Sequence, residues 1–319
     1  MTKSLHPQAQ ALLDAPADPQ ARPWHELSAV EAHAAHRKAM GALCGETMPG
    51  IEIENRIVPK TANTPDVPVR IYTPGGTAPR PVVIFYHGGG FVLGGLDIYD
   101  ALCSRLAHGS KAVVVSVDYR LAPQHKFPAA PDDCLAVAHW VYDNADELNI
   151  DRDRVALAGD SAGANLATVT CHALRDEGQV QPCLQVLMYP MIDGVTETQS
   201  RLRCGSGYRY TQLMDGWFYD HYLRTPADHN DPRVSPLRAA SCAGLPPALV
   251  ITAGFDPLCD EGEAYAARLR DDGVAVELVR FDDMMHGFCN MMGALDRGAE
   301  AIDLCCSHLA AAFKIQNGV

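Results

Sequence analysis

One pentapeptide of this sequence could hold a reactive serine. It reads Gly159-Asp160-Ser161-Ala162-Gly163, follows the apolar run 155–158 and opens a segment with a helical pattern. A serine between a buried strand and a helix sits on a sharp turn, where its hydroxyl projects and a helix N-terminus favours negative charge. A glycine-lined turn with a capping serine is the structural alternative. The position between strand and helix favours Ser161 as a nucleophile.

A second motif could stabilise the charge that such a nucleophile creates. His87-Gly88-Gly89-Gly90 directly follows the apolar run 82–86. Glycines leave backbone N–H groups unshielded, so two of these amides, joined by that of Ala162, could hold an oxyanion. A flexible turn is the alternative. We expect His87 itself to fix the loop by a hydrogen bond and not to act as a base.

A serine needs a base, and the base needs an orienting acid. Asp256 follows the apolar run 249–252 and His286 follows the run 276–281, so both come just after predicted strands. Open α/β sheets place their ligands at the carboxyl ends of strands, and the order serine, acid, histidine is that of α/β hydrolases. Three other acids compete with Asp256 for this role: Asp260, Asp282 and Asp283.

The elements that must position these residues form an alternating pattern. Unbroken apolar runs, typical of strands covered on both faces, occupy 82–86, 112–117, 155–158, 184–189, 248–252 and 274–279. Segments with a helical pattern lie between and after them, at 99–108, 131–148, 162–175, 261–270 and 296–313. This alternation predicts an α/β fold with a mostly parallel sheet flanked by helices. Alternating residues near 51–57 and 67–71 predict an antiparallel edge.

Two segments break this rhythm. Residues 1–22 are rich in Pro, Ala and Gln, and we expect them to be loosely ordered before a helix at about 24–44. Residues 193–236 contain no buried strand but many aromatic side chains, and an excursion of that size is usually functional. Its aromatics, from Tyr208 to Tyr222, either line a pocket or form a core of their own.

The composition excludes several classes of protein. The 26 basic and 39 acidic side chains give a net charge of −13, which argues against a nucleic-acid partner. No phosphate-binding glycine motif is present, and we expect no cofactor. His33 and His36 lie three residues apart in a predicted helix, but no acid completes a metal site, and we expect no metal.

The cysteines and the apolar runs bear on location. Eleven cysteines are scattered without a C-x-x-C pair, which predicts buried, reduced thiols in the cytoplasm. No stretch is apolar enough for a membrane span, and the first residues do not have the pattern of a signal peptide.

Together, these motifs resemble the hormone-sensitive-lipase-like family of microbial carboxylesterases, within the α/β-hydrolase fold. The resemblance covers roughly residues 45–315 and rests on His87–Gly90, Asp118–Pro123, Phe127–Ala130, Gly159–Gly163, Asp256–Leu258 and His286–Phe288. It implies Ser161 as nucleophile, His286 as general base and acid, and Asp256 as orienting carboxylate. It also implies an oxyanion hole from Gly88, Gly89 and Ala162, with Gly90 as an alternative donor.

The resemblance further implies a domain plan and an activity. Residues 1–45 would form an N-terminal cap segment, and residues 46–319 a hydrolase core with a cap insertion at about 193–231. The substrate would be a small-molecule ester with a short-to-medium acyl chain. The alternatives are an amidase, lactonase or carbamate hydrolase with the same triad, or a catalytically silent small-molecule receptor. A homodimer through the last strand, near 274–281, is also expected.

Overall fold

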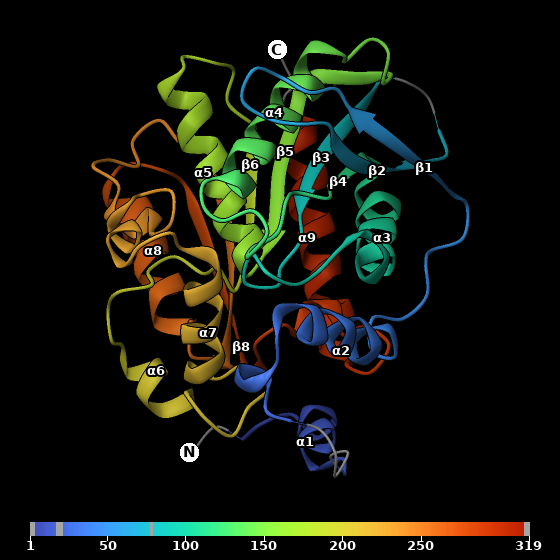
Figure 1. Ribbon diagram of the computed structural model, residues 1–319. Helices are drawn as coiled ribbons and strands as arrows, with labels where there is room; N and C mark the ends of the chain where they lie inside the picture. Colours follow the sequence, from blue (N-terminus) through green and yellow to red (C-terminus); the bar gives the residue numbers. More distant parts are fainter. Residues whose placement is uncertain (1–3, 17–21, 77–78, 316–319) are drawn as a thin grey trace.

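The predicted apolar runs are the strands of one sheet. The computed structural model describes residues 4–16, 22–76 and 79–315. Within them, eight strands follow the order β1-β2-β4-β3-β5-β6-β7-β8 (Figure 1). Their bounds are β1 Ile51–Val58, β2 Val67–Pro74, β3 Arg80–Tyr86, β4 Val113–Val117, β5 Ile150–Asp160, β6 Leu184–Met188, β7 Ala248–Phe255 and β8 Val276–Met285.

The sheet is antiparallel at one edge and parallel elsewhere. β1 pairs with β2 and β2 with β4 in antiparallel register, whereas every pair from β4 to β8 is parallel. This confirms the predicted α/β fold and its antiparallel edge. The other edge of the sheet is β8.

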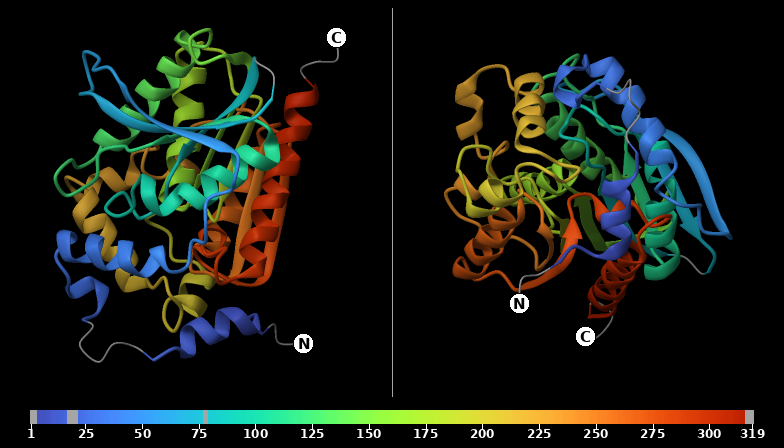
Figure 2. Two further views of the ribbon diagram at one scale, coloured as in Figure 1. Left: turned by 90° about the vertical axis from the view of Figure 1, so that its right-hand side faces the viewer. Right: turned by 90° about the horizontal axis from the view of Figure 1, so that it is seen from below.

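Helices cover both faces of the sheet, which explains the unbroken apolar runs. Val83 and Phe85 of β3 belong to a core cluster with residues of α3 (Asp100–Ser110) and α9 (Asp296–Ile315). Val82 and Ile84 belong to the opposite cluster, which contains residues of the helices on the other face. Those helices are α4 Ala129–Asp143, α5 Ala162–Asp176 and α8 Cys259–Asp271. Figure 2 shows helices on both sides of the sheet.

The N-terminal segment is more ordered than its composition predicts. Pro7–Asp14 forms helix α1, with Ala9 fully buried, so the expectation of loose order is wrong for this stretch; residues 17–21 lie outside the described residues. Apolar contacts of Leu12 and Leu13 with the core outweigh the segment's polar composition. Helix α2 spans Ala29–Gly41, shorter than expected, because Ser28 begins it with a capping box.

The excursion between β6 and β7 is helical, without a strand, as predicted. It contains α6 Gln199–Cys204 and α7 Gln212–Tyr222. In Figure 1 these helices lie, with α1 and α2, at the lower end of the molecule.

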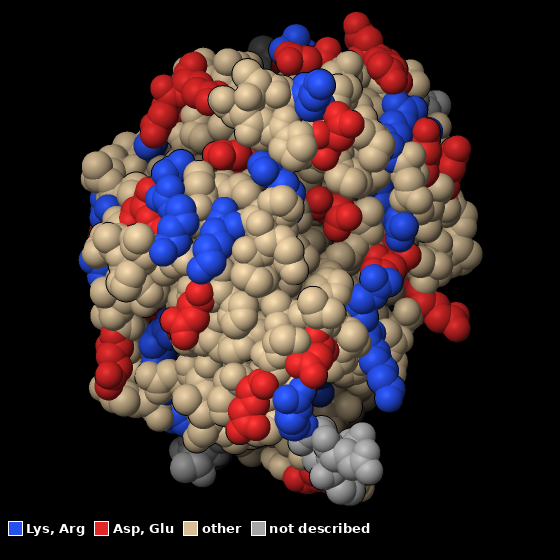
Figure 3. Space-filling view, in the orientation of Figure 1, with Lys and Arg blue, Asp and Glu red and all other residues tan. Residues whose placement is uncertain are grey.

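The cysteines and the surface agree with a reduced chain of mixed charge. All eleven cysteines are free and, except for the half-buried Cys183, buried. Basic and acidic side chains are interspersed on the face that Figure 3 shows. Across the described ranges, no helix has the length and hydropathy needed to cross a membrane.

Candidate active site

Ser161 lies on a tight turn between β5 and α5. Its backbone has a φ of 54°, a region that non-glycine residues rarely adopt. The turn requires the flanking glycines: a Cβ on Gly163 would lie 1.9 Å from the carbonyl oxygen of Tyr86, and one on Gly159 would lie 2.3 Å from that of Gly163. Close approach of α5 to the sheet therefore sets the serine at the strand end.

The predicted acid and base meet at this serine. His286 directly follows β8, and its Nε2 lies 2.9 Å from Ser161 Oγ. Asp256 directly follows β7, and its Oδ2 lies 2.7 Å from His286 Nδ1. Asp256 is fully buried and its Oδ1 accepts a hydrogen bond from the N–H of Leu258, which fixes the carboxylate. The three side chains are positioned to form a catalytic triad.

The competing acids are engaged elsewhere. Asp260 accepts a hydrogen bond from the N–H of Ser200, 2.7 Å away. Asp282 pairs with Arg280, and Asp283 with Arg297. Among these acids, Asp256 is the one bonded to His286.

Nearby carboxylates tune the histidine. Burial alone would lower the pKa of His286, but the negative charge of Asp256, its hydrogen bond, and the charges of Asp160 and Asp215 outweigh it. The pKa of His286 is therefore raised above its ordinary value, which favours the imidazolium that forms when the ring takes a proton from Ser161.

The loop His87–Gly90, called the glycine loop below, offers two free backbone amides beside Ser161. Gly89 and Gly90 line the same cavity as Ser161 and have φ values of 120° and 60°. Their N–H groups, like that of Ala162, donate no hydrogen bond to any residue that the structure describes. His87 holds the loop, because its Nδ1 lies 2.8 Å from the carbonyl of Gly88 and its ring stacks on Tyr119.

Gly88 does not share this geometry. Its N–H donates to Asp160 Oδ1 at 2.7 Å and also lies 3.0 Å from the Tyr99 hydroxyl, so the amide is already used. Burial raises the pKa of Asp160 to about 6, and the hydrogen bonds that Gly88 and the Tyr99 hydroxyl donate to its carboxylate partly offset the effect. The expectation that Gly88 joins Gly89 and Ala162 therefore does not fit the structure. Sequence reasoning missed Asp160, although it stands beside Ser161 in the pentapeptide.

A cavity of about 360 Å³ opens over these groups. The sheet side contributes Ser161, His286 and the glycine loop. The other walls come from the N-terminal segment and from the excursion after β6: Trp24, His36, Ala39, Met40, Arg209, Tyr210, Met214 and Phe218. Most of this second group is apolar, as small-molecule sites usually are.

Some aromatic side chains of the excursion line the cavity, and others pack in a core, so both alternatives left open by the sequence apply. Tyr210 and Phe218 line the cavity, and the ring of Tyr210 lies 4.5 Å from that of His286. Tyr222 is fully buried and stacks on Phe91, which follows the glycine loop, at 3.9 Å. The excursion therefore shapes the cavity and also packs against the loop that supplies the free amides.

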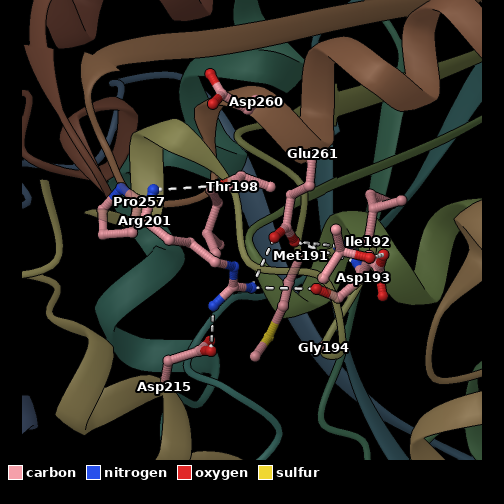
Figure 4. Close-up of polar contacts among 12 residues, drawn as sticks. Met191, Ile192, Asp193, Gly194, Thr198, Arg201, Asp215, Pro257, Asp260 and Glu261 are labelled. Carbon is pink, nitrogen blue, oxygen red and sulfur yellow. Dashed lines mark hydrogen bonds and ion pairs between the residues drawn. The ribbon is translucent and has the colours of Figure 1, made fainter. Parts of the chain in front are cut away.

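A buried ionic cluster fastens the excursion to the core (Figure 4). Arg201 of α6 donates to Asp215 of α7 at 2.5 Å and to Glu261 of α8 at 2.6 Å, and all three are almost fully buried. Tyr210 donates to the other oxygen of Asp215, so the cluster also holds the ring that packs on His286. Periodicity and composition gave no signal for this cluster.

This fold and this site define an α/β hydrolase, and comparison with known proteins agrees. A family model described as alpha/beta hydrolase fold matches residues 83–290. The chain belongs to this family, and the resemblance to the hormone-sensitive-lipase-like carboxylesterases is confirmed.

Several of its relatives are named as ester hydrolases. The chain is 44% identical to carboxylic ester hydrolase LipN of Mycobacterium tuberculosis, over 81% of this chain and 70% of that protein. It is 37% identical to ethyl acetate hydrolase of Pseudomonas putida, over 88% and 89%. Among solved structures, a hyperthermophilic esterase from Pyrobaculum calidifontis is 38% identical with a TM-score of 0.91, covering 97% of this chain and 98% of that one.

Proposed function

We propose that this protein is a serine carboxylesterase in which Ser161, His286 and Asp256 act as the triad. The relay of two hydrogen bonds from Asp256 through His286 to Ser161, beside three free amides, carries the proposal. The names of its relatives, carboxylic ester hydrolase and ethyl acetate hydrolase, support the same reaction.

In the proposed mechanism, Ser161 Oγ attacks the ester carbonyl while His286 Nε2 takes its proton. The amides of Gly89, Gly90 and Ala162 hold the oxyanion, and Asp256 stabilises the imidazolium. His286 then gives the proton to the leaving alkoxide, so the alcohol departs and an acyl-serine remains. Water attacks this ester with His286 again as base, and the carboxylic acid leaves as Ser161 regains its proton.

The cavity supports a short-to-medium acyl preference. Its volume of about 360 Å³ lies at the small end of the usual range for ligand pockets. A series of p-nitrophenyl esters of increasing acyl length should show kcat/KM highest for short chains and falling for long ones. A maximum at long chains would contradict the acyl preference alone.

We further propose that residues 1–45 and about 193–231 act as a cap over the core within 46–319. Both segments contribute cavity walls, through His36 and Met40 on one side and Tyr210 and Phe218 on the other. The buried cluster around Arg201 supports a cap that is firmly attached to the core.

Covalent labelling tests the nucleophile. An aryl phosphonate should add one phosphonyl group to Ser161, detected by peptide mass spectrometry, and Ser161→Ala should stay unlabelled. A silent receptor on this fold would not react. An amidase, lactonase or carbamate hydrolase would be labelled but would prefer its own substrate over matched esters.

We also propose a homodimer through β8. In the sheet described by the structure, β8 is an edge strand with one side unpaired, and such edges readily pair with another chain. Light scattering after size-exclusion chromatography should give twice the mass of the chain. A monomer at micromolar concentration would reject the dimer and leave the activity untouched.

A further inference from the structure

The cavity contains a cation that the ester mechanism does not use. Arg209 lies on the loop between α6 and α7, is half-buried and lines the same cavity as Ser161 and His286. Its guanidinium forms no hydrogen bond, ion pair or ring contact with any residue in the described ranges. Guanidinium groups that leave water normally find a carboxylate partner, because an unpaired charge is costly to bury.

Arg201, in the preceding helix α6, is a buried arginine whose charge is paired. Asp215 and Glu261 flank its guanidinium, and their charges raise its pKa although burial opposes this. Arg209 is the opposite case, since burial lowers its pKa and no carboxylate in the described part of the chain counteracts the effect. An arginine stays protonated even so, and it therefore presents an uncompensated positive charge to the cavity.

The other polar groups of the cavity do not supply the missing anion. His36 lines the cavity, its Nδ1 is buried without a partner, and burial lowers its pKa to about 4, helped by the charges of His33, His87 and Arg209. His36 is therefore neutral at physiological pH. Asp160 also lines the cavity, but its carboxylate already accepts hydrogen bonds from Gly88 and Tyr99.

We propose that Arg209 binds a free carboxylate carried by the substrate, so that the preferred esters are those with a second, ionised carboxyl group. The planar guanidinium can donate two parallel hydrogen bonds to such a group, and a neutral imidazole at His36 can add a third. The cavity is small, so an ester whose carbonyl lies at Ser161 can extend its other end to this wall. The proposal rests on the proposed esterase function and specifies its substrate class.

Matched ester pairs test the charge requirement. On the acyl side, monoethyl succinate is compared with ethyl isocaproate, in which an isopropyl group replaces the carboxylate. On the alcohol side, 2-(butanoyloxy)acetate, the ester of butanoic acid with the hydroxyl of glycolate, is compared with isobutyl butanoate, in which an isopropyl group replaces the carboxylate. The readout is the ratio of kcat/KM for the charged ester to that for the neutral ester, and the two pairs show which part of the substrate meets Arg209.

Three variants give that ratio its meaning. Arg209→Gln should lower the ratio of at least one pair by about tenfold or more, as loss of a charge-assisted bidentate contact does. A change in rate that affects the charged and the neutral ester equally cancels in this ratio. Arg209→Lys should retain part of the preference, since lysine keeps the positive charge but lacks the planar guanidinium that donates two parallel hydrogen bonds. Arg203→Gln removes the same charge from an exposed position on α6 and should leave the ratio unchanged.

The proposal is overturned if Arg209→Gln and the unmodified chain give the same kcat/KM ratio for both ester pairs. Failure of the esterase function is distinguishable, because then neither member of a pair is turned over. In that case, calorimetric binding of monoethyl succinate and ethyl isocaproate to Ser161→Ala, with and without Arg209→Gln, decides the question. If Arg209 recognises a carboxylate, Arg209→Gln should weaken the binding of monoethyl succinate and leave the binding of ethyl isocaproate unchanged.

Discussion

The two walls of the cavity are built by different rules. On the sheet side, Ser161, Asp256 and His286 follow strand ends directly, are almost fully buried, and bond to one another. On the side of the proposed cap, Arg209 comes from a loop and His36 from a helix, and Arg209 has no partner among the described residues.

This difference separates chemistry from selectivity. Parallel strands end at a common edge, so residues placed there are brought together by the sheet itself. The cap wall depends instead on loop geometry and on side-chain packing. Within the described residues, neither Arg209 nor His36 forms a hydrogen bond with the triad. We therefore expect changes in the sheet wall to affect the rate for every ester, and changes in the cap wall to affect which ester is preferred.

The largest effect is expected from Ser161→Ala. Loss of the nucleophile should lower kcat for p-nitrophenyl butyrate by about 10⁴–10⁶-fold, with folding unchanged by circular dichroism. A variant that keeps near-normal turnover would show that the sheet wall does not carry the chemistry.

Asp256→Asn should have the next largest effect. The amide keeps the size of the side chain but disfavours the required tautomer of His286, so kcat should fall by about 10³–10⁴-fold for charged and neutral esters alike. Steady-state kinetics on a matched ester pair measures this. A fall in kcat for only one ester of the pair would contradict the expectation that changes in the sheet wall affect every ester.

Arg201→Met breaks the ionic cluster that attaches the proposed cap to the core. Removing the guanidinium leaves Asp215 and Glu261 buried without their partner, which should destabilise the fold by about 3–5 kcal/mol. Thermal unfolding should show a clear drop in Tm. Arg203→Met, on the exposed side of the same helix, is the control and should change stability by at most about 0.5 kcal/mol. Equal Tm values for the two variants would mean that the cluster does not fasten the cap.

A smaller effect concerns pH. His286 must be neutral to accept the proton of Ser161, so kcat/KM should fall as the pH drops through the pKa of His286. Because Asp256, Asp160 and Asp215 raise this pKa, the midpoint of the acid limb should lie above the value of about 6.5 for a free imidazole. A pH profile of kcat/KM with a midpoint at or below that value would contradict the raised pKa.

The sheet wall could be predicted from the sequence because its signals are local. Apolar runs mark buried strands, and glycine, serine, aspartate or histidine directly after them marks the edge where ligands bind. Gly88 shows the limit, since the choice among three adjacent glycine amides depends on the carboxylate of Asp160, 72 positions later. Arg209 and the Arg201 cluster left no pattern, because contacts between cap elements follow no periodicity.

The backbone of Ser161 has a consequence for evolution. A side chain held at a φ of 54° costs of the order of 1–3 kcal/mol, which a glycine at the same position would largely avoid. Selection for thermal resistance alone would therefore replace the nucleophile. That a serine stands there reflects a trade-off at a single residue, in which part of the folding free energy is given up so that the hydroxyl can meet its substrate.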